Sequence, residues 1–403
     1  MILSMDQERI LCIDFGTTYC KYALFSQNSD ILLQSEIPID NTQAPSIWKE
    51  LLIAIFSQLP IQISAIAISG HGPTILFLDS DGKLCLEPQF WYDLPENFPI
   101  QGDSFYIPKI ASLVKKYPHL LQRVAFILPF PEYICYLLGA DPSVILPRLA
   151  YQSYIWTDVE IQNYKLPRNW FPKFIPMTKS LATVSSRAAN EYKITRGIPL
   201  YCGGTDYLMS LLGSSCIKEG AACNRAGTSD AINICTSKSK SSLFFHIPHI
   251  LEKLFSAAYF LPKGKEDINT ITDYLRHISR KKISIASLPL SIVARSFMIR
   301  SVILKAEEEG IRIQYLVLSG GKNKAAKFLQ LQSNIIGTPL FLPYIVHTEL
   351  LGLFCLVRYI RGYDKSLTNS IKKFFRVRKY YQPQQKKSLD KLFQDARQAL
   401  TCL

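Results

Sequence analysis

Several glycine turns in this chain carry hydroxyl side chains and lie beside an acidic residue, and these are the residues that could do chemistry. One of them, Ser319-Gly320-Gly321, ends an apolar run at 315–318 and precedes a helical pattern. Backbone amides where a helix follows such a turn are a usual place for a nucleotide to bind. A plain strand-to-helix turn is the alternative. The other turns are Asp14 with Gly16-Thr17-Thr18, Gly203-Gly204-Thr205 with Asp206, and Gly227-Thr228-Ser229 with Asp230.

The best-known short signatures of phosphate binding and hydrolysis are absent from the chain. It holds no Gly-x4-Gly-Lys-[Ser/Thr], no Gly-x-Gly-x-x-Gly after a strand, no His-Glu-x-x-His and no Gly-x-Ser-x-Gly. The sequence therefore argues against P-loop proteins, dinucleotide-binding domains, zinc proteases and α/β-hydrolases. The hydroxyl-rich glycine turns remain as the chemical signal.

Strands that alternate with helices must position these turns. An apolar run at 9–13 and an alternating segment at 19–25 predict a β-hairpin. A helix at 46–59 then leads into a strand at 65–69. This alternation predicts an α/β architecture. Further predicted elements are a hairpin around 75–82, a mostly helical middle from 105 to 140, a loop at 237–242, and helices at 207–215, 290–309 and 325–336.

The second half of the chain opens like the first, which indicates an internal duplication. The turn at 16–18 and the turn at 227–229 each join two strand-like segments, 211 positions apart. Such triplets are also common in ordinary turns. We predict two related domains, 1–213 and 214–403, each of which contributes one hydroxyl-rich turn.

Length and composition predict a globular protein rather than a disordered or fibrous one. The chain has 403 residues, 48% of them hydrophobic and 19% charged, with a formal net charge of +14. No uninterrupted apolar stretch is long enough to span a membrane, and the N-terminus lacks the pattern of a secretion signal. The ten cysteines are scattered without zinc spacing. We expect a cytoplasmic protein with reduced thiols and no membrane partner.

Seven lysines and arginines lie between residues 372 and 387, interleaved with Phe374, Phe375, Tyr380 and Tyr381. Basic and aromatic side chains together could bind single-stranded nucleic acid. The prediction favours a C-terminal helix with a solvated basic face and an aromatic face packed inward, rather than a nucleic-acid partner.

Taken in order, the motifs resemble those of the FGGY family of carbohydrate kinases, whose fold is that of actin, hexokinase and Hsp70-type ATPases. The resemblance spans most of the chain. It rests on Ile13-Asp14-Phe15-Gly16-Thr17-Thr18 followed by Lys21, Ile68-Ser69-Gly70-His71-Gly72-Pro73-Thr74, Trp91-Tyr92-Asp93, Gly203-Gly204-Thr205-Asp206, Ala226-Gly227-Thr228-Ser229, and Leu318-Ser319-Gly320-Gly321 through Gly337 with Glu349-Leu350-Leu351-Gly352 after it.

This resemblance implies two related ribonuclease-H-like domains with a cleft between them, and transfer of the γ-phosphoryl group of ATP to a sugar hydroxyl. It implies that Asp206 is the general base and that Asp14 holds Mg²⁺. The implied nucleotide-binding residues are Gly16, Thr17, Thr18, Gly227, Thr228, Ser229, Gly320 and Gly321, and the implied sugar contacts are His71, Trp91 and Asp93.

Each implied role has a structural alternative. Asp206 is also a good N-cap for the helix that follows it, and Asp14 a turn residue. His71 could be a satisfied core histidine. Trp91 and Asp93 could be packing and turn residues.

The chain also departs from the family pattern. It is shorter than the relatives, and the missing length falls between 237 and 292. His347-Thr348-Glu349 stands where an acidic residue and a small one are more typical. The first acceptor we expect is a ketopentose such as xylulose, or a related polyol or sugar acid. Three alternatives stay open: a non-catalytic sugar- or nucleotide-binding regulator of the same fold, a nucleic-acid-associated protein, and an actin-like filament protein. A homodimer is one option for assembly.

Overall fold

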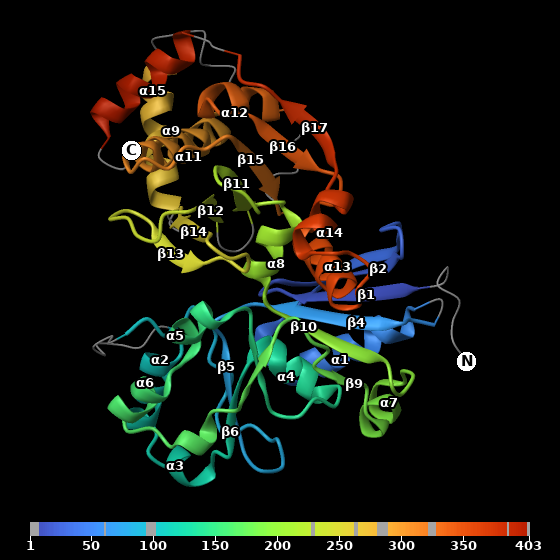
Figure 1. Cartoon of the computed structure of the whole chain (residues 1–403). Coiled ribbons are helices and arrows are strands. Elements are labelled where there is room, and N and C mark those ends of the chain that lie inside the picture. Colours follow the sequence, from blue (N-terminus) through green and yellow to red (C-terminus); the bar gives the residue numbers. More distant parts are fainter. Residues whose placement is uncertain are drawn as a thin grey trace. The chain divides into compact units, whose positions relative to one another are not determined.

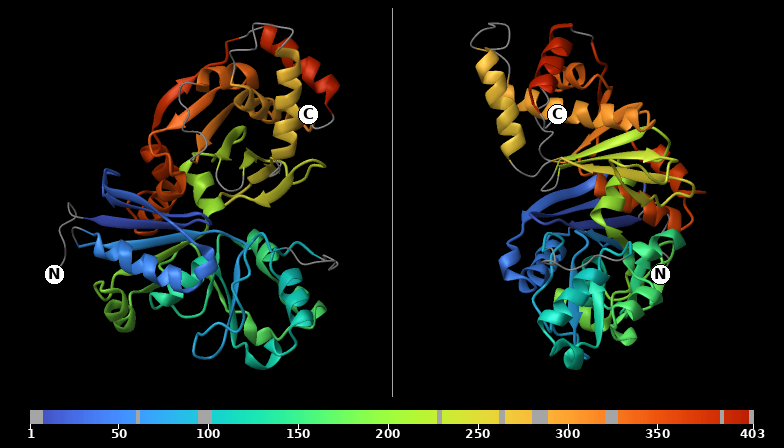
Figure 2. Two further views of the ribbon diagram at one scale, coloured as in Figure 1. Left: turned by 180° about the vertical axis from the view of Figure 1, so that it is seen from behind. Right: turned by 90° about the vertical axis from the view of Figure 1, so that its left-hand side faces the viewer.

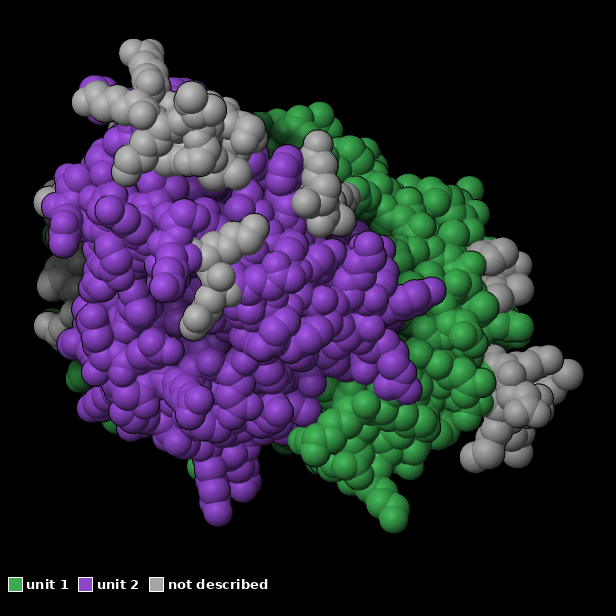
Figure 3. All heavy atoms as spheres, turned by 90° about the horizontal axis from the view of Figure 1, so that it is seen from above, with its two compact units in different colours: residues 1–213, 349–374 green, residues 214–348, 375–403 purple. Residues whose placement is uncertain are grey.

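The computed structural model describes residues 8–59, 62–93, 102–226, 230–261, 265–279, 289–320, 328–384 and 387–400. It divides into two compact units, coloured separately in Figure 3: unit 1 comprises residues 1–213 and 349–374, and unit 2 comprises 214–348 and 375–403. Residues 349–374 thus belong to the same unit as 1–213. The two domains expected at 1–213 and 214–403 stay a prediction.

Unit 1 is built on a six-stranded sheet with the order β3-β2-β1-β4-β10-β9 (Figure 1). Its strands are β1 Arg9–Phe15, β2 Tyr19–Ser26, β3 Ile31–Pro38, β4 Ala65–Gly70, β5 Ile75–Leu78, β6 Phe126–Pro129, β7 Val144–Leu146, β8 Phe174–Pro176, β9 Ala182–Thr183 and β10 Pro199–Thr205. Its helices are α1 Ser46–Ser57, α2 Ile107–Lys116, α3 Leu120–Arg123, α4 Phe130–Leu137, α5 Gln152–Ile155, α6 Asp158–Asn163, α7 Ser186–Tyr192, α8 Asp206–Gly213, α13 Thr348–Ile360 and α14 Leu367–Phe374.

Burial along the strands of unit 1 follows their place in the sheet. The central strand β4 is buried at every residue, as expected for a parallel strand covered on both faces. The hairpin partner β3 alternates between half-buried and exposed residues, as a strand nearer the edge does. The predicted hairpin of β1 and β2 and the predicted strand β4 are confirmed.

Unit 2 is built on a seven-stranded sheet with the order β13-β14-β12-β11-β15-β16-β17. Its strands are β11 Ala221–Ala226, β12 Asp230–Thr236, β13 Phe245–Pro248, β14 Phe255–Phe260, β15 Tyr315–Ser319, β16 Leu340–Pro343 and β17 Val377–Tyr381. Helices α9 Lys265–Ser279, α11 Leu290–Glu308, α12 Leu329–Ile336 and α15 Lys387–Ala399 share one apolar core with one face of this sheet (Figure 2).

The two sheets repeat one pattern of order and direction, which supports the predicted duplication. In unit 1, β1 pairs antiparallel with β2 and parallel with β4, and β4 pairs parallel with β10. In unit 2, β11 pairs in the same way with β12 and β15, and β15 pairs parallel with β16. The two hydroxyl-rich turns therefore join equivalent strands, β1 to β2 and β11 to β12.

One sequence-based prediction needs correction, and two others hold. The middle from 105 to 140 is mostly helical, with α2, α3 and α4, and it also contains strand β6, which pairs with β5. The chain turns back at 79–82 as expected, with antiparallel bridges between Leu78 and Leu84 and between Ile75 and Gln89. The basic stretch, in contrast, does not form one helix. It crosses the end of α14, the edge strand β17 and the start of α15, because Val377, Tyr380 and Tyr381 favour a strand.

Two findings bear on the cysteines and on the helices of the described residues. In the described part of the chain, the cysteines are buried and form no disulfide. Among the same residues, no helix is both long and apolar enough to cross a lipid bilayer.

Candidate active site

Three parallel strands of unit 1 end at one edge of the sheet and bring predicted site residues together. Asp14 on β1 is in register with Ser69 on β4, which is in register with Gly204 on β10. His71 follows β4 directly, and Asp206 follows β10. Ligands of α/β proteins commonly bind at the carboxyl ends of such strands. Asp14, His71 and Asp206 thus lie at the carboxyl ends of neighbouring strands of one sheet.

The Asp14 carboxylate is buried, with only 1% of the residue exposed. The Ser69 hydroxyl donates to Oδ1 at 2.7 Å, and the second oxygen, Oδ2, has no hydrogen-bond partner. Burial raises the pKa of Asp14 to about 7, and the Glu349 carboxylate adds to this, while the Lys21 ammonium opposes it. An unpartnered carboxylate oxygen of this kind fits a hard cation such as Mg²⁺, which needs few protein ligands when phosphates and waters supply the rest. Among the described residues there is no cluster of three metal-ligating side chains.

Lys21 and Glu349 also belong to this site. Lys21 lies opposite Asp14 in the β1–β2 register, and its Nζ is 3.8 Å from Asp14 Oδ2. The same ammonium donates to Glu349 Oε1 in the first turn of α13. Burial alone would lower the pKa of Lys21, but Glu349 and Asp14 raise it above its usual value. Lys21 was part of the predicted motif without a role, and no local sequence signal placed Glu349 beside it.

Asp206 is the first residue of α8 and interacts electrostatically with the residues around Asp14. Its charge acts on both Asp14 and Lys21. The strand before it is irregular between Cys202 and Gly204, and Gly204 has a φ of 66° that favours glycine. Such irregularities redirect the chain next to functional sites. The position of Asp206 suits a base near the phosphate-binding turn, and it equally suits a residue of the first helical turn.

The first hydroxyl-rich turn is held from two sides. The Gly16 amide donates to the Tyr19 carbonyl at 3.1 Å within the turn. The Trp91 indole Nε1 donates to the Thr17 hydroxyl at 3.0 Å, and Asn41 Nδ2 donates to the Thr17 carbonyl at 2.6 Å. A hydroxyl that accepts a hydrogen bond keeps its own proton for donation. Trp91, predicted to contact sugar, therefore lies against the predicted phosphate turn and leaves Thr17 able to donate.

His71 is buried and stacks on Phe130 with ring centroids 4.2 Å apart. Its Nδ1 lies 2.9 Å from the Thr74 hydroxyl, which also accepts from the Trp91 amide. Its Nε2 is buried without a hydrogen-bond partner. Donation from Thr74 to Nδ1 would leave the proton of a neutral imidazole on Nε2. The ring thus packs as a core histidine would, and it also holds one unused polar atom that a sugar hydroxyl could satisfy.

Burial lowers the pKa of His71 to about 3, so we expect this residue to make the protein less stable in acid. His71 binds a proton near pH 6.5 in the unfolded chain but not in the folded protein. The free energy of unfolding therefore decreases as the pH falls below that value. Between pH 7 and pH 5 this loss should reach about 2 kcal/mol. The measurement is urea denaturation of the wild type and of His71→Gln across that range. A wild type whose stability declines no more steeply than that of the variant would contradict the prediction.

Asp93 behaves as the turn residue that the alternative interpretation predicted. Its Oδ2 accepts from the Phe90 amide at 2.7 Å, and the Lys109 ammonium donates to the Phe90 carbonyl. Burial lowers the pKa of Lys109 to about 8, although Asp93 raises it. These contacts give Asp93 a role in shaping the loop that carries Trp91.

The predicted nucleotide residues of unit 2 are described only in part. Gly320 directly follows β15 and has a φ of 86°, a conformation that favours glycine. Gly321 and the turn at 227–229 lie outside the described residues. Arg225 on β11 is in register with Ser319 on β15. The ends of the two strands that lead to these turns are therefore neighbours in the sheet.

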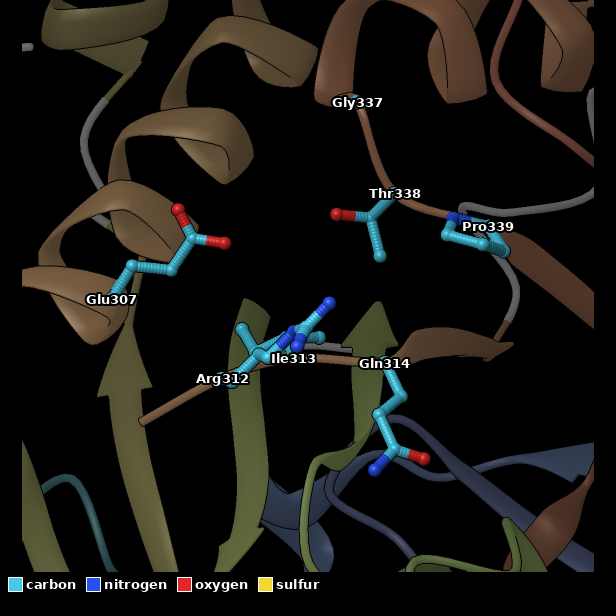
Figure 4. A pocket seen from close by; sticks show the side chains of 7 residues that line it. All are labelled: Glu307, Arg312, Ile313, Gln314, Gly337, Thr338 and Pro339. Carbon is cyan, nitrogen blue, oxygen red and sulfur yellow. The ribbon is translucent and has the colours of Figure 1, made fainter. Parts of the chain in front are cut away.

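Unit 2 also has a pocket of about 580 Å³ (Figure 4). Gly337, at the end of the predicted nucleotide motif, is one of the residues that line it. Residues 312–314 precede β15 and residues 337–339 precede β16, so the pocket lies at the amino ends of these strands. Gly320 follows the carboxyl end of β15, which is the opposite end of that strand.

Comparisons with known proteins show what this chain is similar to in sequence and fold. No model of a protein family matches the chain. A xylulose kinase of Lactococcus lactis is 24% identical over 284 residues, which cover 59% of this chain and 56% of that protein. The chain thus spans about half the length of the curated relatives it matches.

Two solved structures are similar over nearly all of both chains. A ligand-bound xylulose kinase from Lactobacillus acidophilus has a TM-score of 0.77 and 18% identity, and covers 97% of each chain. Plasmodium falciparum glycerol kinase with ADP has a TM-score of 0.76 and 15% identity, and covers 98% of this chain and 97% of that one. The predicted α/β fold of two related ribonuclease-H-like, actin-like domains is confirmed. The names of these proteins also agree with the predicted carbohydrate kinase, and the chain is similar in sequence and fold to xylulokinase-like kinases of the FGGY type.

Proposed function

We propose that this protein phosphorylates a sugar hydroxyl with ATP. The observation that carries the proposal is the register of β1, β4 and β10, which gathers Asp14, His71 and Asp206 at one edge of the unit 1 sheet. Phosphoryl transfer to an alcohol mainly needs positioning, neutralisation of charge and one group to accept the hydroxyl proton. The similarity to sugar kinases supports this proposal.

The chain's own residues divide the work as follows. Asp206 accepts the proton of the attacking hydroxyl, an effect of roughly 10²–10⁴-fold on rate. His71 Nε2 donates to a sugar oxygen, and Trp91 lies beside it on the loop that Asp93 shapes.

The phosphates of ATP are bound by the turn at 16–18 and by the turn at 227–229, and Gly320-Gly321 contact the nucleotide. Asp14 holds Mg²⁺, directly or through water, and the ion neutralises phosphate charge when bound.

For the acceptor we propose a ketopentose such as xylulose, or a related polyol or sugar acid. The relatives support this range, since they are named xylulose kinase and glycerol kinase. The buried Nε2 of His71 suits a polyhydroxyl ligand, because it has no hydrogen-bond partner in the protein and can bond to a hydroxyl.

The test is ADP release from Mg-ATP across a panel of ketoses, polyols and sugar acids. We expect one sugar to accelerate ADP release well above the sugar-free rate, and mass spectrometry to find its monophosphate. Nucleotide binding without any sugar-dependent ADP would contradict the kinase.

A binding-only protein of the same fold is the second candidate, and one contact favours it. Lys21 Nζ lies 3.8 Å from Asp14 Oδ2, and it already binds the Glu349 carboxylate. An ammonium that is neutralised in this way attracts phosphate less. The panel of sugars separates the two candidates.

A further inference from the structure

Glu349 binds the lysine that stands beside the predicted phosphate turn. Its Oε1 accepts from Lys21 Nζ, and the two side chains are only 10% and 24% exposed. Lys21 comes from β2, directly after the turn at 16–18, and Glu349 comes from α13, 328 positions later in the chain. Both belong to unit 1, so this contact lies within one compact unit.

The charges around Lys21 are unbalanced against an anionic ligand. Asp14, Asp206 and Glu349 all act on this one ammonium. The phosphates of a nucleotide would add further negative charge at the same place. The ammonium has three N–H donors, so phosphates could bind another of them, but the Glu349 carboxylate that neutralises the ammonium would then repel the phosphates at short range.

The backbone that carries Glu349 is held firmly. Gly352, one turn further along α13, stands so close to α8 that an added Cβ would lie 2.0 Å from the Met209 carbonyl oxygen. The first turn of a helix also favours a negative side chain such as Glu349. The carboxylate can therefore leave Lys21 by rotation of its own side chain, whereas its Cα stays in place.

We propose that Glu349 is a specificity-determining residue that competes, within the molecule, with nucleotide phosphates for Lys21. Removal of its charge then increases the affinity for ATP, and the increase depends on Lys21. The gain in affinity applies to ATP and not to adenosine, because adenosine has no phosphate to take the place of the carboxylate. This inference rests on the proposed nucleotide site.

The experiment compares the dissociation constants of Mg-ATP and adenosine for the wild type, Glu349→Gln and Glu349→Ser by isothermal titration calorimetry. We expect each variant to bind ATP at least about ten-fold more tightly than the wild type and adenosine equally well. Glu50→Gln, at an exposed position on α1, is the matched control and should leave both constants unchanged. In the Lys21→Met background, Glu349→Gln should give no gain, which a double-mutant cycle measures.

The outcomes separate this inference from the proposed function. If the folded Glu349 variants bind ATP no more tightly than a wild type that turns over a sugar, the inference is wrong and the kinase stands. If the variants bind ATP more tightly but neither they nor the wild type phosphorylate any sugar, the kinase is wrong and the inference stands. If none of these proteins binds ATP, both are wrong. Circular dichroism and melting curves establish that the variants are folded.

Discussion

Asp206→Asn should lower sugar-dependent ADP release by at least about a hundredfold while ATP still binds. The amide has the shape of the carboxylate but cannot accept the hydroxyl proton, so it removes the proposed base and leaves the proposed phosphate-binding turns untouched. Asp206 begins α8 at the same sheet edge as Asp14, and its charge acts on Asp14 and Lys21. The measurement is kcat with the best sugar of the panel, together with calorimetric ATP binding.

Asp158→Asn is a suitable control for this substitution. Asp158 lies on α6 in an ion pair with Arg168, and its side chain is 77% exposed. An exposed pair contributes little to stability, so this variant should retain the wild-type rate. If Asp206→Asn keeps more than a tenth of the wild-type kcat, Asp206 is not the base. Its place in the first turn of α8 would then be its main role.

Local sequence patterns were sufficient to predict the frame of the site. The apolar run before Asp14, the glycine turn after it and the alternating segment beyond are all determined by neighbouring residues, and β1 and β2 form as expected. The repeat of that arrangement at 227–229 predicted two related domains, and β11 and β12 occupy places in their sheet equivalent to those of β1 and β2. Elements with strong periodicity are predictable because burial of one face decides them.

The contacts that complete the site could not be predicted in this way. Glu349 meets Lys21 only because α13 packs with unit 1, and the apolar run at 350–357 of that helix does not say which sheet it will cover. Phe354 settles that choice by packing against Phe25 on β2, with ring centroids 4.9 Å apart. For the same reason the pairing of β5 with β6 was missed, since a four-residue apolar run also suits the start of a helix.

Burial also divides the predicted site residues in a way that residue type does not. Asp14 and His71 are both buried and each keeps one polar atom without a hydrogen-bond partner, a costly state that a bound ligand would relieve. Asp93 is instead used by the Phe90 amide of its own loop. Residue type and spacing alone do not show this difference between the three residues.

Arg358→Met should destabilise unit 1 by about 3 kcal/mol, which urea denaturation at pH 7 measures. Arg358 lies on α13 with its side chain 4% exposed, and its Nε donates to Asp364 Oδ2 at 2.8 Å. It also donates to the Gln27 carbonyl at 2.6 Å and lies over the Phe374 ring at 4.8 Å. Its removal leaves a buried carboxylate with weaker compensation from Lys373, whose Nζ is 3.6 Å from Asp364 Oδ1.

The pH dependence of this loss identifies the buried charge as its cause. Burial is the largest single influence on the pKa of Asp364 and raises it, but the hydrogen bond and charge of Arg358, together with the Lys373 ammonium and other lowering contacts, outweigh burial and hold the pKa below its usual value. The stabilisation is therefore complete above the usual pKa of about 4 and is lost as the pH falls below it, so the difference between wild type and variant should shrink in acid. Arg187→Met is the matched control, because Arg187 is 83% exposed in its ion pair with Glu191 and its loss should change stability by less than about 0.5 kcal/mol. Two outcomes would contradict the prediction: Arg358→Met lowers the free energy of unfolding at pH 7 no more than the control does, or it lowers it equally at every pH. In either case the ion pair with Asp364 does not stabilise the packing of α13, and the aromatic contacts alone do so.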